Sequence, residues 1–145
     1  MAGLATSGTL THWFRDNFAK EIPKDKAFEI LEAEASQSPP GSKGLIVLPY
    51  FSGERTPIHD PKARGTIFGL DLTHNRGDIF RAFLEGIAMG TAQVFETYEA
   101  IGQNPERSWL SEVGPKIISG CKQPLISVRL IKLYLKKVLE PNILH

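Results

Sequence analysis

The sequence is poor in cysteine and has no long apolar run. Its single cysteine, Cys121, can form no disulfide within the chain and offers no cysteine cluster for zinc or an iron–sulfur centre, so we expect a reducing compartment. The apolar stretch Gly44–Phe51 falls far short of the roughly 20 residues that span a bilayer. No basic residue precedes an apolar run in Met1–Gly8. We therefore predict a cytoplasmic protein without a membrane partner.

The chain also lacks an excess of charge. Its 145 residues include 17 basic and 16 acidic side chains, and 41% are hydrophobic, which is ordinary globular composition for about one domain. No nucleic-acid partner is predicted from this balance. The charge is unevenly distributed, because residues 1–107 carry 11 basic and 14 acidic side chains and residues 108–145 carry 6 and 2. The first part is therefore slightly acidic, and the second part is basic.

Three segments have apolar residues at helical spacing. Helices are expected over Thr9–Phe18 and in the segment that follows Pro23 and ends at a Ser-Pro-Pro-Gly sequence. The longest helix is expected over Arg76–Ile101, where apolar residues recur at intervals of three and four. Gly86 and Gly90 within it permit another backbone to approach closely, at a cost in helix propensity of about 1 kcal/mol each.

Two segments have the composition of strands. The continuous apolar run Gly44–Tyr50 predicts a strand that is covered on both faces, as in mixed or parallel sheets, and Thr66–Leu72 predicts a second strand. The polar segment between them, Phe51–Gly65, is rich in turn formers and long for a simple connection, and long loops are often functional. Together with the helices, these strands indicate an α/β or α+β fold.

The long polar segment contains a titratable cluster, formed by Glu54, Arg55, His59 and Asp60. A histidine near two carboxylates can serve as a general base or as half of a metal site. The alternative is structural, because Asp before Pro favours an extended turn entry and Arg and Glu side chains can fix a loop by internal hydrogen bonds. We favour the structural interpretation.

Gly8 and His12 are candidate ligand contacts at the start of the first helix. Backbone N–H groups at a helix N-terminus attract anions such as phosphate, and Gly8 would allow close approach. His12 follows one turn later and could face a ligand, but on these residues alone we favour a surface histidine without a ligand. The sequence contains no P-loop, zincin motif or Ser/His/Asp constellation.

Four segments match one family in order and spacing. They are Gly8–Asp16, Leu48–Pro57 with its Gly-Glu-Arg-Thr-Pro sequence, Asp60–Gly65, and Arg81–Ala88. Over roughly the first hundred residues the chain resembles the C-terminal lobe of the FGGY carbohydrate kinases, and it is most similar to the xylulokinase-type branch. Four motifs in the same order are more specific than any one of them alone.

The resemblance implies an α/β fold, namely part of the C-terminal lobe of an actin/Hsp70-like (ribonuclease H-type) sugar kinase. Such kinases close two lobes around ATP with Mg and a sugar or polyol, and their catalysis depends mainly on positioning and electrostatics. In the family the catalytic aspartate and most of the sugar site precede the matched region, so we assign no catalytic residue and no metal ligand here. The resemblance places Gly8 at a backbone contact to the nucleotide and His12 at a position that is often Gln in the glycerol kinase branch.

The resemblance ends near residue 107, and we divide the chain there into a partial kinase domain, 1–107, and a basic tail, 108–145, which we expect to be poorly packed. The family continues with a strand, a Gly-Gly-Gly turn and a helix. The sequence of the tail contains no glycine triplet and shows no strand-turn-helix pattern. One explanation is a frameshift near Arg107. The alternative is a genuine C-terminus, in which Leu125–Leu139 forms a basic amphipathic helix for a partner or an anionic surface.

Three functions remain open at this point. The chain can be a portion of an ATP-dependent carbohydrate kinase that is inactive in isolation, with an N-terminal kinase lobe as the missing partner. It can instead be a non-catalytic binding or regulatory module, or a half-enzyme that complements a separate N-terminal lobe. Because the fragment would lack much of its sheet, edge strands and apolar faces should be exposed.

The frameshift hypothesis makes a specific prediction about the gene. When permitted codons for Ser108–Ser127 are read from their third bases, they can encode Leu-Ala-Val-Gly-Gly-Gly-Pro-Lys-Asn-Asn-Leu-Trp-Leu-Gln-Ala-Thr-Ser-Asp-Ile-Ser, which contains the motif that the family has at this point. We expect the DNA across this junction to use the codons that this alternative frame requires. Sequencing the gene checks this, and incompatible codons would remove the hypothesis.

Overall fold

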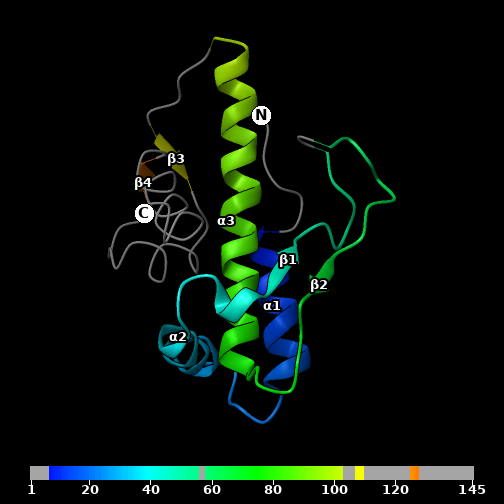
Figure 1. Ribbon diagram of the computed structural model, residues 1–145. Helices are drawn as coiled ribbons and strands as arrows, with labels where there is room; N and C mark the ends of the chain where they lie inside the picture. Colours follow the sequence, from blue (N-terminus) through cyan, green and yellow to red (C-terminus); the bar gives the residue numbers. More distant parts are fainter. Residues whose placement is uncertain (1–6, 56–57, 103–106, 110–124, 128–145) are drawn as a thin grey trace, which may run out of the picture.

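The computed structural model describes residues 7–55, 58–102, 107–109 and 125–127. The longest helix stands at the centre, with a second helix at its lower left and a third helix and two strands on its other side (Figure 1). In chain order the elements are α1 (Ser7–Phe18), α2 (Ala27–Gln37), a short 3₁₀ turn η1 (Ser42–Gly44), β1 (Ile46–Leu48), β2 (Thr66–Phe68), α3 (Arg76–Ala100), β3 (Arg107–Trp109) and β4 (Leu125–Ser127). The mixture of helices and strands confirms the α/β expectation.

The three predicted helices are present, and their ends have local causes. α3 begins at Arg76 because the Asn75 side chain accepts a hydrogen bond from the Asp78 N–H (2.9 Å), and the Asp78 carboxylate accepts one from the Asn75 N–H (2.9 Å). This reciprocal pair is a capping box, which satisfies two N–H groups that have no partner within the helix. α3 ends at Ala100, one residue before the predicted Ile101.

The core lies where α1, α2 and β1 pack against the first half of α3. Its centre is aromatic: the Phe14 ring lies 5.1 Å from both the Phe80 and the Phe83 rings, and all three side chains are buried. Such ring pairs add to the stabilisation that area burial alone provides. Other buried members of this core are Leu10, Leu31, Ala35, Leu45, Val47, Leu84 and Ile87.

The prediction that the first strand is covered on both faces is wrong. β1 pairs antiparallel with β2, in the register Ile46↔Phe68 and Leu48↔Thr66. Val47 points into the core and is 4% exposed, whereas Ile46 and Leu48 are 53% and 46% exposed. The physical reason is that the core covers the Val47 side of β1, while the described residues provide no layer over Ile46 and Leu48. Composition alone could not distinguish the two cases.

The second strand is shorter than predicted and ends at Phe68 rather than Leu72. Gly69 takes a φ of +86°, in the left-handed region that interrupts a strand. A β-carbon at position 69 would also lie 2.9 Å from the carbonyl oxygen of Gly44. The chain therefore leaves the ladder at Gly69.

The predicted close approach at Gly86 is confirmed. A β-carbon at this position would lie 2.4 Å from the carbonyl oxygen of Val47, so α3 can approach β1 only with glycine there. Gly77 does the same against α2, where a β-carbon would lie 2.6 Å from the carbonyl oxygen of Glu34. Two glycines thus set the distances from α3 to β1 and α2.

The tail contributes a second strand pair. β3 and β4 are antiparallel, with Arg107↔Ser127 and Trp109↔Leu125, and they form a sheet separate from β1–β2. Residues 125–127 are therefore a strand, whereas the alternative of a basic helix over Leu125–Leu139 required a helical turn there. The rest of that range, and most of 108–145, lies outside the described residues. The boundary at residue 107 and the poor packing of the tail stay predictions.

Replacing Gly86 tests the approach of α3 to β1. Gly→Ala normally stabilises a helix by up to about 1 kcal/mol, but Gly86→Ala must push the two backbones apart. We expect a net loss of about 1–3 kcal/mol in the free energy of unfolding, measured with urea. Glu96→Ala, on the exposed surface of the same helix, should change it by no more than about 0.5 kcal/mol. A stabilised Gly86→Ala variant would contradict the packing.

Candidate functional site

The two predicted ligand contacts lie one helical turn apart on α1. Leu10, Thr11 and Phe14 are buried and fix the orientation of the helix, while Gly8 is partly exposed and His12 is exposed. The Thr11 hydroxyl donates to the carbonyl oxygen of Gly8 (2.8 Å). Residues four apart share one face of a helix, so Gly8 and His12 point to the same side. Their role as nucleotide contacts stays a prediction.

His12 has an aromatic neighbour that the sequence did not predict. Its ring lies 5.3 Å from the ring of Phe28, in the first turn of α2, and the guanidinium of Arg15 lies 5.3 Å from the centre of the same ring. Phe28 therefore contacts two side chains of α1, those of His12 and Arg15. Its contact with Arg15 is a cation–π interaction. The signal that could have found it is the alignment of His12 with Arg15 at i, i+3.

The loop after β1 is fixed by hydrogen bonds within itself. The buried Glu54 carboxylate accepts from the Arg55 N–H (2.8 Å), the Glu54 N–H donates to the Asp60 carbonyl (2.9 Å), and the Asp60 carboxylate accepts from the Lys62 N–H (2.8 Å). The His59 imidazole lies 3.1 Å from the Arg55 carbonyl oxygen. These contacts favour the structural interpretation of the cluster. Among the described residues, no three His, Cys, Asp or Glu side chains gather so as to hold a metal ion.

Tyr50 ties this loop to α3. Its hydroxyl donates to the Gln93 side-chain oxygen (3.5 Å), and its side chain is buried. Burial, together with the negative charge of Glu54, raises the pKa of Tyr50 above its usual value. The phenol is therefore neutral at physiological pH and serves as a hydrogen-bond donor.

The buried carboxylate of Asp78 faces the turn before β1. It accepts from the Lys43 ammonium (2.8 Å) as well as from the Asn75 N–H. Burial is the largest single influence and raises its pKa, but the hydrogen bonds from the Asn75 N–H and the Lys43 ammonium, with the charge of Lys43, prevail and lower the pKa of Asp78 to about 2. Asp78 is therefore ionised and links the start of α3 to residue 43.

A buried ion pair on α3 holds the same turn from the other side. The Arg81 Nε donates to the Glu85 carboxylate (2.9 Å), which also accepts from the Gly41 N–H (3.2 Å) and the Ser42 hydroxyl (3.2 Å). Arg81 further donates to the Ala35 carbonyl at the end of α2 (3.4 Å). Sequence reasoning missed this role of Arg81–Ala88, although an Arg and a Glu four residues apart within an apolar helical stripe indicate a buried pair.

Arg76 joins the first turn of α3 to α2 and the segment before it. Its guanidinium donates to both Glu34 oxygens, from Nε at 2.8 Å and from Nη2 at 2.5 Å, and also contacts the Glu21 carboxylate. The hydrogen bonds to Glu34 raise the pKa of Arg76 above its usual range, against the effect of burial. The arginine is thus a permanent cation between two helices.

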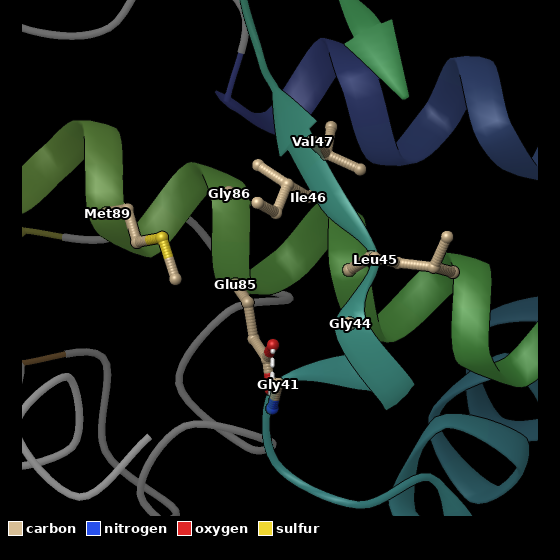
Figure 2. Close-up of a pocket in the computed structure, with 9 residues that line it drawn as sticks. Gly41, Gly44, Leu45, Ile46, Val47, Glu85, Gly86 and Met89 are labelled. Atoms are coloured by element: carbon tan, nitrogen blue, oxygen red, sulfur yellow. Dashed lines mark hydrogen bonds between the residues drawn. The ribbon is translucent and has the colours of Figure 1, made fainter. Parts of the chain in front are cut away.

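A small pocket lies between β1 and α3. Its volume is about 160 Å³, and apolar side chains dominate its wall, with the Glu85 carboxylate at one end (Figure 2). The residues that line it are Gly41, Gly44, Leu45, Ile46, Val47, Ala82, Glu85, Gly86 and Met89. Because Gly86 has no side chain, the pocket reaches the backbone of α3. It is far too small for a nucleotide.

In the described part of the chain, α3 packs against β1, and α1 precedes both and packs against α3. The model of the FGGY family of carbohydrate kinases, C-terminal domain, matches residues 1–111. The chain belongs to this family, as the four motifs predicted. No described helix is long and apolar enough to cross a membrane.

The curated relatives that match this chain include ribulokinases, gluconokinases and xylulose kinases. Ribulokinase 2 of Staphylococcus saprophyticus is 39% identical over 80 residues, which are 55% of this chain and 15% of that protein. Xylulose kinase of Bacillus subtilis is 35% identical over 98 residues, 68% of this chain and 19% of that one. The chain thus spans less than a fifth of the length of these curated relatives.

Solved structures give the same assignment. The crystal structure of xylulose kinase from Rhodospirillum rubrum superimposes on 94% of this chain and 25% of its own, with a TM-score of 0.69 and 31% identity. Gluconate kinase from Lactobacillus acidophilus covers 97% of this chain and 31% of its own, with a TM-score of 0.59 and 26% identity. The predicted actin/Hsp70-like fold class is confirmed.

The lowered pKa of Asp78 predicts an acid-sensitive contribution to stability. A carboxyl whose pKa is lowered by folding stabilises the protein above its unfolded pKa, near 3.8, and loses that contribution as the pH falls towards about 2. Asp78→Asn should reduce the free energy of unfolding at pH 7 by about 1–3 kcal/mol and make its decline between pH 4 and 2 shallower.

Chemical denaturation at a series of pH values measures both effects. Asp25→Asn is the matched control, because Asp25 is exposed, and it should leave the pH profile unchanged. Parallel profiles for Asp78→Asn and the unaltered chain would show that the Asp78 carboxylate does not contribute as argued.

Proposed function

We propose that this chain is a portion of an ATP-dependent carbohydrate kinase, which transfers the γ-phosphoryl group of ATP to a hydroxyl group of a sugar or polyol. The observation that carries the proposal is membership of the FGGY family, supported by four motifs in the family's order. Relatives named ribulokinase, gluconokinase and xylulose kinase support a carbohydrate acceptor. We further propose a cytoplasmic location for it.

Gly8 and His12 are the residues of this chain that we propose to contact the nucleotide. ATP with Mg²⁺ supplies the transferred phosphoryl group and the neutralisation of its charge. The first turn of α1 presents backbone N–H groups without helical partners and the positive end of the helix dipole, which favour an anion. The His12 ring is exposed and positioned by Phe28, so it can donate or accept a hydrogen bond beside that turn. No described residue is proposed as a Mg²⁺ ligand.

The isolated chain is proposed to lack phosphoryl transfer. In the family that the chain resembles, the general base and most of the sugar site lie outside the matched region. One edge of a nucleotide site also cannot offset the entropy lost on binding, because several converging contacts are needed. A second candidate, a half-enzyme that works with a separately supplied N-terminal lobe, is favoured by the exposed apolar face of β1–β2. A non-catalytic module is the third.

ATP binding tests the isolated chain. We expect no binding of ATP with Mg²⁺ tighter than roughly millimolar, which corresponds to about −4 kcal/mol, by titration calorimetry or ligand-observed NMR. Micromolar binding that His12→Ala weakens would contradict the proposal and show a nucleotide site complete within this chain. His59→Ala, in the loop after β1, serves as the control for losing an exposed histidine.

Mixing this chain with a separate N-terminal kinase lobe distinguishes the three candidate functions. ATP consumption is measured on xylulose, ribulose and glycerol, first with the chain alone and then with the separately expressed N-terminal lobe of Bacillus subtilis xylulose kinase. Activity only in the mixture supports the half-enzyme, and activity of the chain alone would refute the proposed inactivity. Folded components that bind each other without any turnover favour the non-catalytic module.

A further inference from the structure

The imidazole of His74 is buried between two segments that lie far apart in the sequence. Its side chain is 2% exposed and belongs to the loop between β2 and α3. Its Nε2 lies 3.4 Å from the carbonyl oxygen of Lys43, in the turn before β1. Its Nδ1 lies 3.1 Å from the backbone nitrogen of Asp71 and 2.9 Å from an oxygen of the Asp71 carboxylate. His74 therefore links the loop after β2 to the turn.

The two contacts at Nδ1 exclude each other. A ring nitrogen of histidine accepts a hydrogen bond only when it carries no proton, and donates one only when it does. The N–H of Asp71 is a donor, whereas the carboxylate of Asp71 is an acceptor. The protonation of Nδ1 thus decides which group of Asp71 the imidazole binds.

The contact at Nε2 decides where a neutral His74 carries its proton. The carbonyl oxygen of Lys43 can only accept, so Nε2 must carry a proton to bind it. The neutral ring then has a free lone pair on Nδ1, which accepts from the Asp71 N–H. A second proton on Nδ1 removes that lone pair and leaves the Asp71 carboxylate as the acceptor at 2.9 Å.

The Asp71 carboxylate carries the negative charge that this bond requires. Hydrogen bonds from the Thr73 hydroxyl (2.6 Å) and the Thr73 N–H (2.7 Å) lower the pKa of Asp71 below its usual value. The carboxylate is therefore ionised at neutral pH. Its side chain is 62% exposed, so water can bind it when the imidazole does not.

Other charged groups near this loop are paired with one another. On the turn, the Lys43 ammonium binds the Asp78 carboxylate (2.8 Å), and on α3 the Arg76 guanidinium binds glutamates of α2 and of the segment before it. The pKa of Asp78 is about 2, so this carboxylate keeps its charge over the range in which histidines titrate. Asp71 thus supplies the charge in contact with the imidazole.

We infer that His74 is a proton-dependent switch, in which protonation of Nδ1 moves its hydrogen bond from the N–H of Asp71 to the carboxylate of Asp71. Nε2 keeps its contact with Lys43 in both forms. The step takes up one proton from solvent and breaks no covalent bond, and it replaces a neutral hydrogen bond by a charge-assisted one. The loop and the turn also touch at Gly69, where a β-carbon would lie 2.9 Å from the carbonyl oxygen of Gly44. The contact between β2's loop and the turn that leads into β1 therefore depends on pH.

NMR spectroscopy of the ¹⁵N-labelled chain tests the switch between about pH 8 and 5. At the alkaline end, the nitrogen shifts of His74 should be those of a neutral ring with its proton on Nε2. At the acid end, both nitrogens should be protonated, and the Asp71 amide proton should move upfield along the same curve as it loses its acceptor. A neutral ring protonated on Nδ1, a ring that stays in one form, or an Asp71 amide that does not follow His74 would overturn the inference.

Asp71→Asn tests the charged partner. Asparagine keeps an oxygen for Thr73 but carries no charge, so His74 should take up its proton at a pH lower by about 0.3 unit or more. Asp25→Asn is the matched control, because Asp25 is exposed, and it should leave the titration of His74 unchanged. Circular dichroism of both variants confirms that the fold is retained. Coincident His74 titrations in Asp71→Asn and the unaltered chain would refute the switch.

Discussion

The arrangement of α3, β1 and α2 depends on the hydrogen bonds that the Glu85 carboxylate accepts. Four successive residues, Gly41 to Gly44, have positive φ angles of 82°, 49°, 56° and 90°. For Ser42 and Lys43 the left-handed conformation costs roughly 1–2 kcal/mol each. Hydrogen bonds to charged groups contribute about 1.5–3 kcal/mol each, and the turn has them to Glu85 from one side and to Asp78 from the other. The two carboxylates therefore outweigh the backbone strain, and the turn delivers β1 onto α3.

The helices and the positions of β1 and β2 could be predicted from the sequence, whereas the coverage of β1 and the end of β2 could not. The helices of α1 and α3 follow from apolar spacing within the chain, and the start of α3 follows from the adjacent pair Asn75 and Asp78. Coverage of β1 depends on which segments lie against it, and Gly44–Tyr50 reads identically whether one face or both are covered. The end of β2 at Gly69 depends on the carbonyl of Gly44, 25 residues earlier, and such a contact leaves no local pattern.

The candidate site shows the same division. Spacing placed Gly8 and His12 on one face of α1, which is a property of a single helix. Phe28 was missed because it belongs to a second helix, whose approach is set by the core residues Phe14 and Leu31 rather than by any feature beside His12. The hydrogen bonds within the loop cluster could be expected from the sequence, because Glu54 and Asp60 bond mostly to backbone close in sequence, where turn chemistry can be predicted.

The two sides of β1 contribute differently to the stability of this chain. The inner face of β1 contributes Val47 to the core, and its outer face leaves Ile46 in water, although each buried side chain of this size is worth about 1.5–3 kcal/mol. Three residues of α3 hold β1 and the turn before it in place without help from the exposed side of β1. They are Asp78, Glu85 and Gly86. The described part of the chain can therefore keep its turn, strand and helix in register while Ile46 and Leu48 stay exposed.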